Sequence, residues 1–249
     1  MGRVAGLWRY PIKSHGFEPV TRTRLETGRT MPWDRVWAIA HERARIAPGS
    51  RDWAPCANFS QGAKSPLLMA IRARTDEATG RLRLTHPDAV PIEIDPDDPA
   101  DQVRLIDWVL PLSASDRARP AFVVRGDRGL TDSPMPSISV VNAASLDALS
   151  RQVGTSLGAE RFRANILVEG FGPWEELGWV GRDIRIGGAR LAVREPIDRC
   201  KATCVDPGTG RRDLDMLAAL ESGWGHRDFG VYAVVVEGGE VAIGDPVGT

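Results

Sequence analysis

Short apolar runs separated by turn-forming residues are the feature that most restricts how this chain folds. Gly occurs 26 times and Pro 18 times among 249 residues, and both interrupt the apolar runs throughout the sequence. Short runs bounded by Gly, Pro and Asp are typical of β-strands. The predicted strands are Arg3–Tyr10, Arg35–His41, Leu67–Arg74, Arg81–His86, Ala121–Arg125, Ile138–Val141, Asn165–Val168, Arg190–Arg194, Val231–Glu237 and Val241–Ile243.

Three segments carry helix-start and helix-stop signals instead. In each, an Asp or Asn precedes apolar residues at helical spacing, and a Pro or Gly closes the segment. The predicted helices begin at Asp98, Asn142 and Asp213 and end at Pro111, Gly154 and Gly223. The chain is therefore predicted to be mainly β with a few helices, in the α+β class.

The stretch 113–120 is rich in Arg, Ala and Asp and directly follows the first predicted helix. A polar stretch between two sets of strands is typical of a domain boundary. We therefore expect two β-rich domains, at about 1–112 and about 113–249.

The charge balance and the hydropathy exclude several classes of function. Lys and Arg number 32 against 33 Asp and Glu, so the net charge of -1 gives no global basic character for binding nucleic acid. No window approaches about 18 uncharged apolar residues, so no segment is predicted to span a membrane. The N-terminus lacks the long apolar stretch of a secretory signal, so we expect a cytoplasmic protein.

The cysteine and histidine counts restrict metal and redox chemistry. The three cysteines, Cys56, Cys200 and Cys204, are too few and too odd in number for a disulfide framework. They are also too few for a four-thiolate iron–sulfur cluster. The four histidines are scattered without a His-Glu-x-x-His pair, so a zinc site is not predicted.

Residues 154–158 match the Gly-x-Ser-x-Gly pattern of a hydrolase nucleophile turn. That turn needs a buried strand before it, whereas here a predicted helix precedes the pattern. A glycine-rich loop after a helix is therefore the favoured interpretation. The common glycine-rich loops that bind nucleotide phosphates are absent from the sequence.

The densest group of reactive side chains lies in residues 194–210, where a predicted strand ends and a turn-rich loop follows. In that loop Cys200 lies between Arg199 and Lys201, and flanking cations lower the pKa of a thiol. A thiolate of this kind can bind a transition metal or carry sulfur. For Cys204, a buried hydrophobic role and a functional role are equally open.

Polar side chains also gather at the ends of predicted strands. Two follow the first strand, one begins the second, and two directly adjoin the strand at 165–168. Together they offer cations and a hydroxyl for a phosphate, and an amide for the edge of a heterocycle. The phosphate candidates are Lys13, Ser14, Arg35 and Arg163, and the heterocycle candidate is Asn165.

Several of these motifs resemble one known family. The segment from Leu7 to Ser14 resembles the opening of the MOSC N-terminal β-barrel domain. The segment from Phe162 to Ile166, the run 199–210 and the closing residues 229–247 resemble the MOSC domain itself. The two-part arrangement is similar to the mitochondrial amidoxime-reducing component and to bacterial reductases of N-hydroxylated bases.

The resemblance implies two β-barrel-like domains with a molybdenum cofactor (Mo-molybdopterin) bound between them. The metal-binding cysteine of the family matches Cys200, and an Asp near the metal matches Asp132. Positions that hold the cofactor phosphate match Lys13, Ser14 and Arg35, and positions that contact the pterin match Arg163, Asn165 and Arg199.

Two positions depart from the family pattern. Ser133 matches a cofactor-contacting Ser, but two nearby prolines make this segment irregular, so Ser137 is an alternative. Cys204 stands where a Thr or another small residue is common, so a second thiol close to the site is an open alternative.

The resemblance implies a molybdenum-dependent reductase of N–O bonds in N-hydroxylated small molecules, with Cys200 as a metal ligand. Asp132 is implied either as a group that supports the metal ligands from outside or as a proton-handling group. Since the chain cannot ligate an iron–sulfur cluster, electrons are expected from a separate redox protein of the ferredoxin, cytochrome b5 or flavin reductase type. One alternative is a cofactor carrier or sulfur-transfer module without turnover. Another is a metal-free β-barrel that binds a small molecule.

Overall fold

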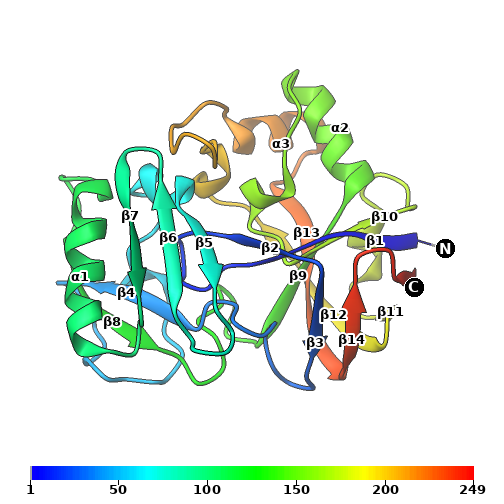
Figure 1. Cartoon of the computed structure of the whole chain (residues 1–249). Coiled ribbons are helices and arrows are strands. Elements are labelled where there is room, and N and C mark those ends of the chain that lie inside the picture. Colours follow the sequence, from blue (N-terminus) through cyan, green and yellow to red (C-terminus); the bar gives the residue numbers. More distant parts are fainter. Residues whose placement is uncertain (1) are drawn as a thin grey trace.

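The computed structural model describes residues 2–249, which form fifteen strands, three α-helices and six short 3-10 helices (Figure 1). The strands are β1 (Gly2–Arg9), β2 (Glu18–Val20), β3 (Arg22–Leu25), β4 (Trp37–His41), β5 (Arg72–Thr75), β6 (Leu82–His86), β7 (Ala89–Ile94), β8 (Pro120–Arg125), β9 (Ser137–Asn142), β10 (Ile166–Glu169), β11 (Asp183–Ile186), β12 (Ala189–Asp198), β13 (Asp228–Glu237), β14 (Gly239–Ala242) and β15 (Pro246–Gly248). The α-helices are α1 (Pro99–Val109), α2 (Ala143–Val153) and α3 (Met216–Trp224), and the 3-10 helices are η1 (Cys56–Asn58), η2 (Pro66–Ala70), η3 (Leu110–Leu112), η4 (Ala159–Phe162), η5 (Glu175–Trp179) and η6 (Lys201–Cys204). The prediction of a mainly β chain with a few helices is confirmed.

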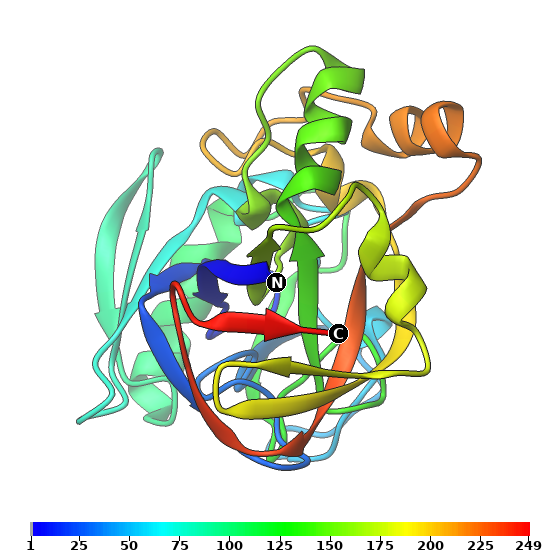
Figure 2. The same ribbon diagram turned by 90° about the vertical axis from the view of Figure 1, so that its right-hand side faces the viewer.

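Seven strands close into a barrel in the order β10, β9, β13, β12, β11, β15 and β1, and the antiparallel pairing of β1 with β10 closes the ring. Strand β2 extends this sheet beyond β1. The barrel strands bury a core that includes Val4, Ile138, Leu191 and Val235. Figure 2 views this barrel with both chain ends toward the reader. Closure leaves the barrel strands without free edges, except at the short strand β2.

A second body of structure is built from residues that precede β9. It contains the pair β4–β8 and the three-stranded sheet β5–β6–β7, and α1 packs against β7 and β8 (Figure 1). Its core includes Trp37, Leu84 and Leu105. The predicted start of α1 is confirmed, because the Asp98 carboxylate accepts a hydrogen bond from the Asp101 backbone N–H at 2.9 Å.

Strand pairing runs between the two halves of the sequence. Strand β1, near the N-terminus, lies in the barrel between β10 and β15. Strand β8 lies after the predicted domain boundary, but it pairs with β4, which lies before that boundary. The domain boundary near residues 112 and 113 stays a prediction, and the two bodies exchange strands across it.

Most predicted elements differ from the structure by a few residues, and the strand predicted at 190–194 continues through Pro196 to Asp198. Two further differences have a clear physical reason. The third helix is capped by Asp215 instead of Asp213, because the Asp213 carboxylate accepts hydrogen bonds from Arg161. The predicted strand at 67–74 begins as the 3-10 helix η2, with Pro66 at its first position. Pro has no backbone N–H for a sheet and its φ suits the first turn of a helix, so the strand starts only at Arg72.

The Gly-x-Ser-x-Gly match lies outside any strand-to-helix turn. Gly154 ends α2 in the left-handed conformation, with its backbone N–H on the last turn of the helix. The pattern therefore marks a glycine-ended helix and the loop after it, in line with the interpretation from the sequence.

Candidate functional site

A cleft of about 630 Å³ lies where the second body meets the barrel. Its walls combine residues from the first 69 positions with residues from positions 132 to 232. The lining residues are Lys13, Ser14, Arg35, Cys56, Gln61, Gly62, Ala63, Met69, Asp132, Ser133, Pro134, Ser139, Arg161, Phe162, Arg163, Glu195, Pro196, Ile197, Asp198, Arg199, Cys200, Ala202, Thr203 and Tyr232. The cleft thus gathers every predicted catalytic or cofactor-contacting residue except Asn165, whereas the alternatives Ser137 and Cys204 do not line it.

Three of these residues adopt an unusual backbone conformation. Ser14, Arg35 and Arg163 have φ values of 65°, 53° and 52°, in the left-handed region that non-glycine residues rarely occupy. Such residues cost about 1–3 kcal/mol each and cluster at functional sites, where the surrounding structure holds them. Their meeting in one cleft makes it the candidate functional site of the fold.

Lys13 and Asp132 form the ion pair on the floor of the cleft. The ammonium of Lys13 is almost fully buried and donates to the backbone oxygen of Leu130 at 2.8 Å and to the Asp132 carboxylate. Desolvation in the cleft acts to raise the pKa of Asp132, but the charges of Lys13 and Arg35 outweigh it and hold that pKa well below its usual range. Asp132 is therefore ionised at neutral pH and accepts protons poorly.

Arg35 and Arg163 lie together but differ in their charge partners. The Arg35 guanidinium contacts the buried Asp34 carboxylate at 2.5 Å and donates to the backbone oxygen of Arg163 at 3.1 Å. Arg163 packs over the ring of Tyr10 at 4.2 Å and donates to the Gly16 backbone oxygen at 3.3 Å. Within residues 2–249 it has no carboxylate partner, and its Nη2 atom bonds nothing.

The missing partner changes the acidity of Arg163. Desolvation, followed by repulsion from Arg35, lowers the pKa of Arg163 to about 10. The side chain remains a cation at neutral pH. An anion in the cleft would supply the counter-charge that the protein itself lacks.

Cys200 is held at the start of a loop that leaves strand β12. It is exposed, and its backbone oxygen accepts hydrogen bonds from the N–H and hydroxyl of Thr203 at 3.1 and 3.0 Å. The cleft walls desolvate the thiol and raise its pKa, and the charge of Asp132 adds to this. The expected net lowering of this pKa is wrong: the charge of Arg199 does lower it, but desolvation outweighs that charge.

The second thiol of the cleft is Cys56, which the sequence did not indicate. Its Sγ donates to Asp132 Oδ1 at 3.0 Å, and desolvation together with the Asp132 charge raises the pKa of Cys56 to about 11. Cys204 instead lies in an apolar cluster with Met216 and Leu220 and is almost fully buried. Of the two alternatives for Cys204, the structure favours the buried hydrophobic role.

Asn165 lies behind the cleft wall. Its carboxamide oxygen accepts from the backbone N–H and the hydroxyl of Ser139 at 3.0 and 2.9 Å, and its amide donates to the Trp8 backbone oxygen at 3.2 Å. It is almost fully buried and does not line the cleft. The structure corrects the placement predicted for Asn165, because its polar atoms join strands β1, β9 and β10.

Two further residues that were predicted to contact the cofactor, Arg199 and Ser133, line the cleft. The guanidinium of Arg199 donates most of its hydrogen bonds to the backbone oxygens of Phe162 and Phe229. These bonds fix the guanidinium against the cleft wall. Ser133 lines the cleft and Ser137 does not, which favours the first of these two alternatives. Tyr232, missed by the sequence reasoning, also lines the cleft, where desolvation and the Asp132 charge raise its pKa well above the usual range.

The cleft offers a metal ion single protein ligands and no cluster of them within residues 2–249. Within residues 2–249, no three His, Cys, Asp or Glu side chains are grouped to hold a metal ion. A metal here would thus take one bond from Cys200 and its other ligands from a bound small molecule. Across the same residues, no helix is long and apolar enough to cross a membrane.

Comparison with known families identifies the two parts. The MOSC N-terminal β-barrel domain matches residues 1–119, and the MOSC domain matches residues 127–248. The chain belongs to the MOSC domain proteins that carry the MOSC N-terminal β-barrel domain. The resemblance seen in the sequence motifs is confirmed.

Several named relatives share part of this sequence. A molybdenum cofactor sulfurase of Anopheles gambiae is 29% identical over 92% of this chain, which spans 34% of that protein. A molybdenum cofactor sulfurase of Homo sapiens is 36% identical over 37% of this chain, which spans 12% of that protein. The chain thus spans about a third or less of the length of these relatives.

A crystal structure of the YUAD protein from Bacillus subtilis is similar over 99% of this chain and 94% of its own. The sequence identity is 14% and the TM-score is 0.46. Likeness at this level carries no inference about function.

Proposed function

We propose that this chain binds the molybdenum cofactor in the cleft and reduces N–O bonds of N-hydroxylated small molecules. The observation that carries the proposal is the meeting, in one cleft, of an accessible thiol, Cys200, and a partly buried cation without a carboxylate partner, Arg163, whose Nη2 atom bonds nothing within residues 2–249. The cofactor has an anionic phosphate at one end and a metal that accepts a thiolate at the other. One cofactor molecule would therefore supply both an anion for Arg163 and a metal for Cys200.

The phosphate end fits the floor of the cleft. Lys13, Arg35 and Arg163 converge there from different segments of the chain, and Ser14 adds a hydroxyl. Arg holds phosphate by paired, charge-assisted hydrogen bonds. A phosphate at this point would give the Arg163 Nη2 atom the acceptor that residues 2–249 do not provide.

The metal end fits the loop that carries Cys200. Because the pKa of this thiol is raised, metal binding at Cys200 must release a proton, and the affinity rises with pH. When bound, the cofactor supplies the two-electron redox chemistry. Cys200 acts as a ligand that tunes the metal and leaves the cleft open toward the substrate.

Reduction of an N–OH group to N–H consumes two electrons and two protons and releases water. Asp132 is ionised, so in this proposal it holds the Lys13 ammonium in place and donates no proton. Cys56 and Tyr232 have raised pKa values and hold their protons at neutral pH. The Cys56 thiol donates a hydrogen bond to the ionised Asp132 carboxylate, and the two protons of the reduction come from water that enters the cleft.

Electrons come from a redox centre outside these 249 residues, since three cysteines cannot ligate an iron–sulfur cluster. A ferredoxin, a cytochrome b5 or a flavin reductase is the expected type of donor. Such partners bind through small, weak interfaces, so a reduced dye can replace them in an assay.

The proposal is tested with the full chain produced in a host that makes the cofactor. The protein is supplied with a reduced dye and an N-hydroxylated amidine, and the amidine product is measured by chromatography. We expect turnover in the wild type and in Lys201→Ala, whose side chain does not line the cleft, and none in Cys200→Ala. Turnover at the wild-type rate in Cys200→Ala would refute the proposed role of the thiol.

A second function is favoured by the names of the relatives, which are molybdenum cofactor sulfurases. In that case the cleft would hold the cofactor, or a persulfide on Cys200, without turnover of its own. Bound cofactor with no reduction across a broad panel of N–O substrates would support this carrier or sulfur-transfer role over the reductase.

A further inference from the structure

Arg161, whose guanidinium is buried, forms an ion pair with the exposed Asp213 carboxylate at the base of the loop that carries Cys200. Its guanidinium donates to both oxygens of the Asp213 carboxylate at 2.8 Å, and its side chain is only 6% exposed. The same group also donates to the Thr203 backbone oxygen at 3.3 Å. The hydrogen bonds from Arg161 lower the pKa of Asp213, so the pair stays ionised at neutral pH.

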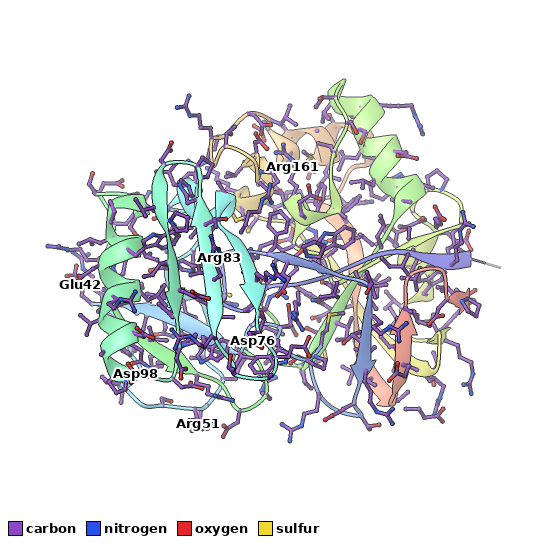
Figure 3. The ribbon with its side chains drawn as sticks, in the orientation of Figure 1. Glu42, Arg51, Asp76, Arg83, Asp98 and Arg161 are labelled. Atoms are coloured by element: carbon purple, nitrogen blue, oxygen red, sulfur yellow. The ribbon has the colours of Figure 1, made fainter. Side chains whose placement is uncertain are left out.

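These contacts fix both ends of the loop that runs from Cys200 to Asp213. At its first end, the N–H and hydroxyl of Thr203 donate to the Cys200 backbone oxygen. At its second end, the Asp213 backbone N–H donates to the Cys204 backbone oxygen at 3.2 Å. Arg161 contacts both ends, since one atom of its fork reaches Thr203 and both reach Asp213. Figure 3 labels Arg161 on the side of the molecule where this loop lies.

Arg161 also belongs to the segment that carries the uncompensated cation. It lies in η4, and Arg163 follows two residues later, with Phe162 between them packed on Phe229 at 4.2 Å. All three residues of this short segment line the cleft. The position of Cys200 is therefore tied, through Arg161, to the position of Arg163.

We propose that Arg161 is a positioning residue that sets the Cys200 thiol at a fixed distance from Arg163, so that one bound group can engage both. This inference rests on the proposed binding of the molybdenum cofactor. The two parallel hydrogen bonds from the Arg161 guanidinium to the Asp213 carboxylate fix the relative orientation of the segments that carry the two groups. Groups that orient metal ligands typically change metal affinity about 10–100-fold when removed.

The test compares two arginine–carboxylate pairs, each with a buried guanidinium, in the full chain produced in a host that makes the cofactor. Arg161→Met removes the fork and keeps most of the side-chain volume. The matched control is Arg9→Met, because Arg9 is equally buried, at 7%, and pairs with Glu18 at 3.0 Å outside the cleft. The readouts are molybdenum retained after dialysis and the number of sulfur neighbours of molybdenum from X-ray absorption.

We expect Arg161→Met to retain molybdenum roughly 10–100-fold more weakly and to lose one sulfur neighbour of the metal. Arg9→Met should keep the wild-type values, although its folded state is also less stable. Wild-type retention in Arg161→Met, or an equal loss in Arg9→Met, would overturn the positioning role.

A third readout separates this inference from the proposed function. Alkylation of Cys200 by iodoacetamide is measured by peptide mass in cofactor-free protein. Release of the loop should speed the alkylation in Arg161→Met and leave it unchanged in Arg9→Met. If the wild type binds no molybdenum, the proposed function fails. Equal alkylation rates of Cys200 in both variants would refute the positioning role of Arg161 itself.

Discussion

At the scale of single residues, the cleft is defined by which of its cations have partners. Lys13 has Asp132 and Arg35 has Asp34, whereas Arg163 has only an aromatic face and a backbone oxygen. Arg163 is partly buried, and a cation that lacks a counter-ion in such a place destabilises a folded protein. Its presence in the cleft indicates that a bound anion completes the site.

This view predicts opposite effects of Arg163→Met on stability and on binding. Loss of the unpaired charge should raise the free energy of unfolding of the cofactor-free protein by about 1 kcal/mol, or its melting temperature by about 2–4 °C. Cofactor retention should fall. Thermal unfolding and pterin content measure the two effects. Arg35→Met is the contrasting variant, because it leaves the buried Asp34 carboxylate without its cation and should lower stability. A destabilised Arg163→Met protein would contradict the argument.

His15 predicts a pH dependence of stability. Its ring is fully buried, its Nδ1 contacts the Lys13 backbone oxygen at 2.6 Å, and desolvation lowers its pKa to about 4. The unfolded state binds the proton near pH 6.5, so stability falls as pH drops from about 6.5 to about 4. Between pH 7 and pH 5, this effect amounts to about 2 kcal/mol.

The measurement is urea unfolding at pH 7 and pH 5 for the wild type and His15→Gln. The variant should lose about 2 kcal/mol less than the wild type between these two pH values. Glu176, whose pKa is raised by burial, changes stability in the opposite direction but is the same in both proteins. An equal loss in both proteins would show that His15 is protonated as readily in the native state as in the unfolded one.

The sequence indicated eight of the residues that line the cleft, several of them because they adjoin apolar strands. Lys13, Ser14 and Arg35 are polar groups at strand ends, and Cys200 has a recognisable loop around it. Cys56 has no such signal, since only the fold brings its segment against Asp132. The pKa of Cys200 was also not predictable, because desolvation by distant segments outweighs the charges that are adjacent in sequence.

At the scale of elements, the turn at Gly210, which follows Cys200 in the chain, packs closely against Leu67 of the second body. Gly210 has a φ of +68°, and a Cβ added there would lie 2.7 Å from the Cα atom of Leu67. Arg212 reinforces the contact by donating to the Ala63 backbone oxygen at 2.6 Å. The glycine is needed both for its conformation and for this proximity.

Two alanine substitutions separate the two requirements. Gly154 also has a positive φ, of 73°, but a Cβ there would meet nothing within 4 Å. We expect Gly154→Ala to cost about 1 kcal/mol from backbone strain. Gly210→Ala should cost about 1–3 kcal/mol more, from overlap with the backbone of Leu67. Denaturant unfolding measures both, and equal costs would contradict the close docking of this turn.

Element prediction succeeded where local signals were strong. The caps at Asp98 and Asn142 placed two helices, because a capping side chain acts on its own neighbours. The third cap was placed two residues early, because Arg161 takes the carboxylate of Asp213. Strands as short as β2 and β15 have too few residues for a pattern, and the barrel alone defines them.

At the scale of the whole molecule, the barrel depends on the first strand of the chain. Strand β1 lies between β10 and β15, and its Val4 and Leu7 are buried in the barrel core. Sequence motifs could indicate two β-rich parts, but not that the N-terminal strand closes the C-terminal barrel. Pairings between such distant segments leave no periodic signal in either one.

This topology predicts the behaviour of fragments. A chain of residues 113–249 lacks β1, exposes two strand edges and should show no cooperative thermal transition. A chain in which residues 2–30 are linked to residues 129–249 should regain it, because Thr30 donates to the Arg128 backbone oxygen at 3.2 Å, which brings the two cut ends close together. Circular dichroism during heating tests both chains. Cooperative unfolding of the first fragment would contradict the role of β1.

The most direct test of the central claim is the molybdenum and pterin content of the full chain, purified from a host that makes the cofactor. Molybdenum is measured by mass spectrometry and pterin by fluorescence after oxidation, in the wild type, Arg163→Met and Cys200→Ala. We predict stoichiometric molybdenum and pterin in the wild type, loss of both in Arg163→Met and weakened retention of the metal in Cys200→Ala. Wild-type protein that carries neither, or Cys200→Ala protein that holds molybdenum as firmly as the wild type, would contradict the account.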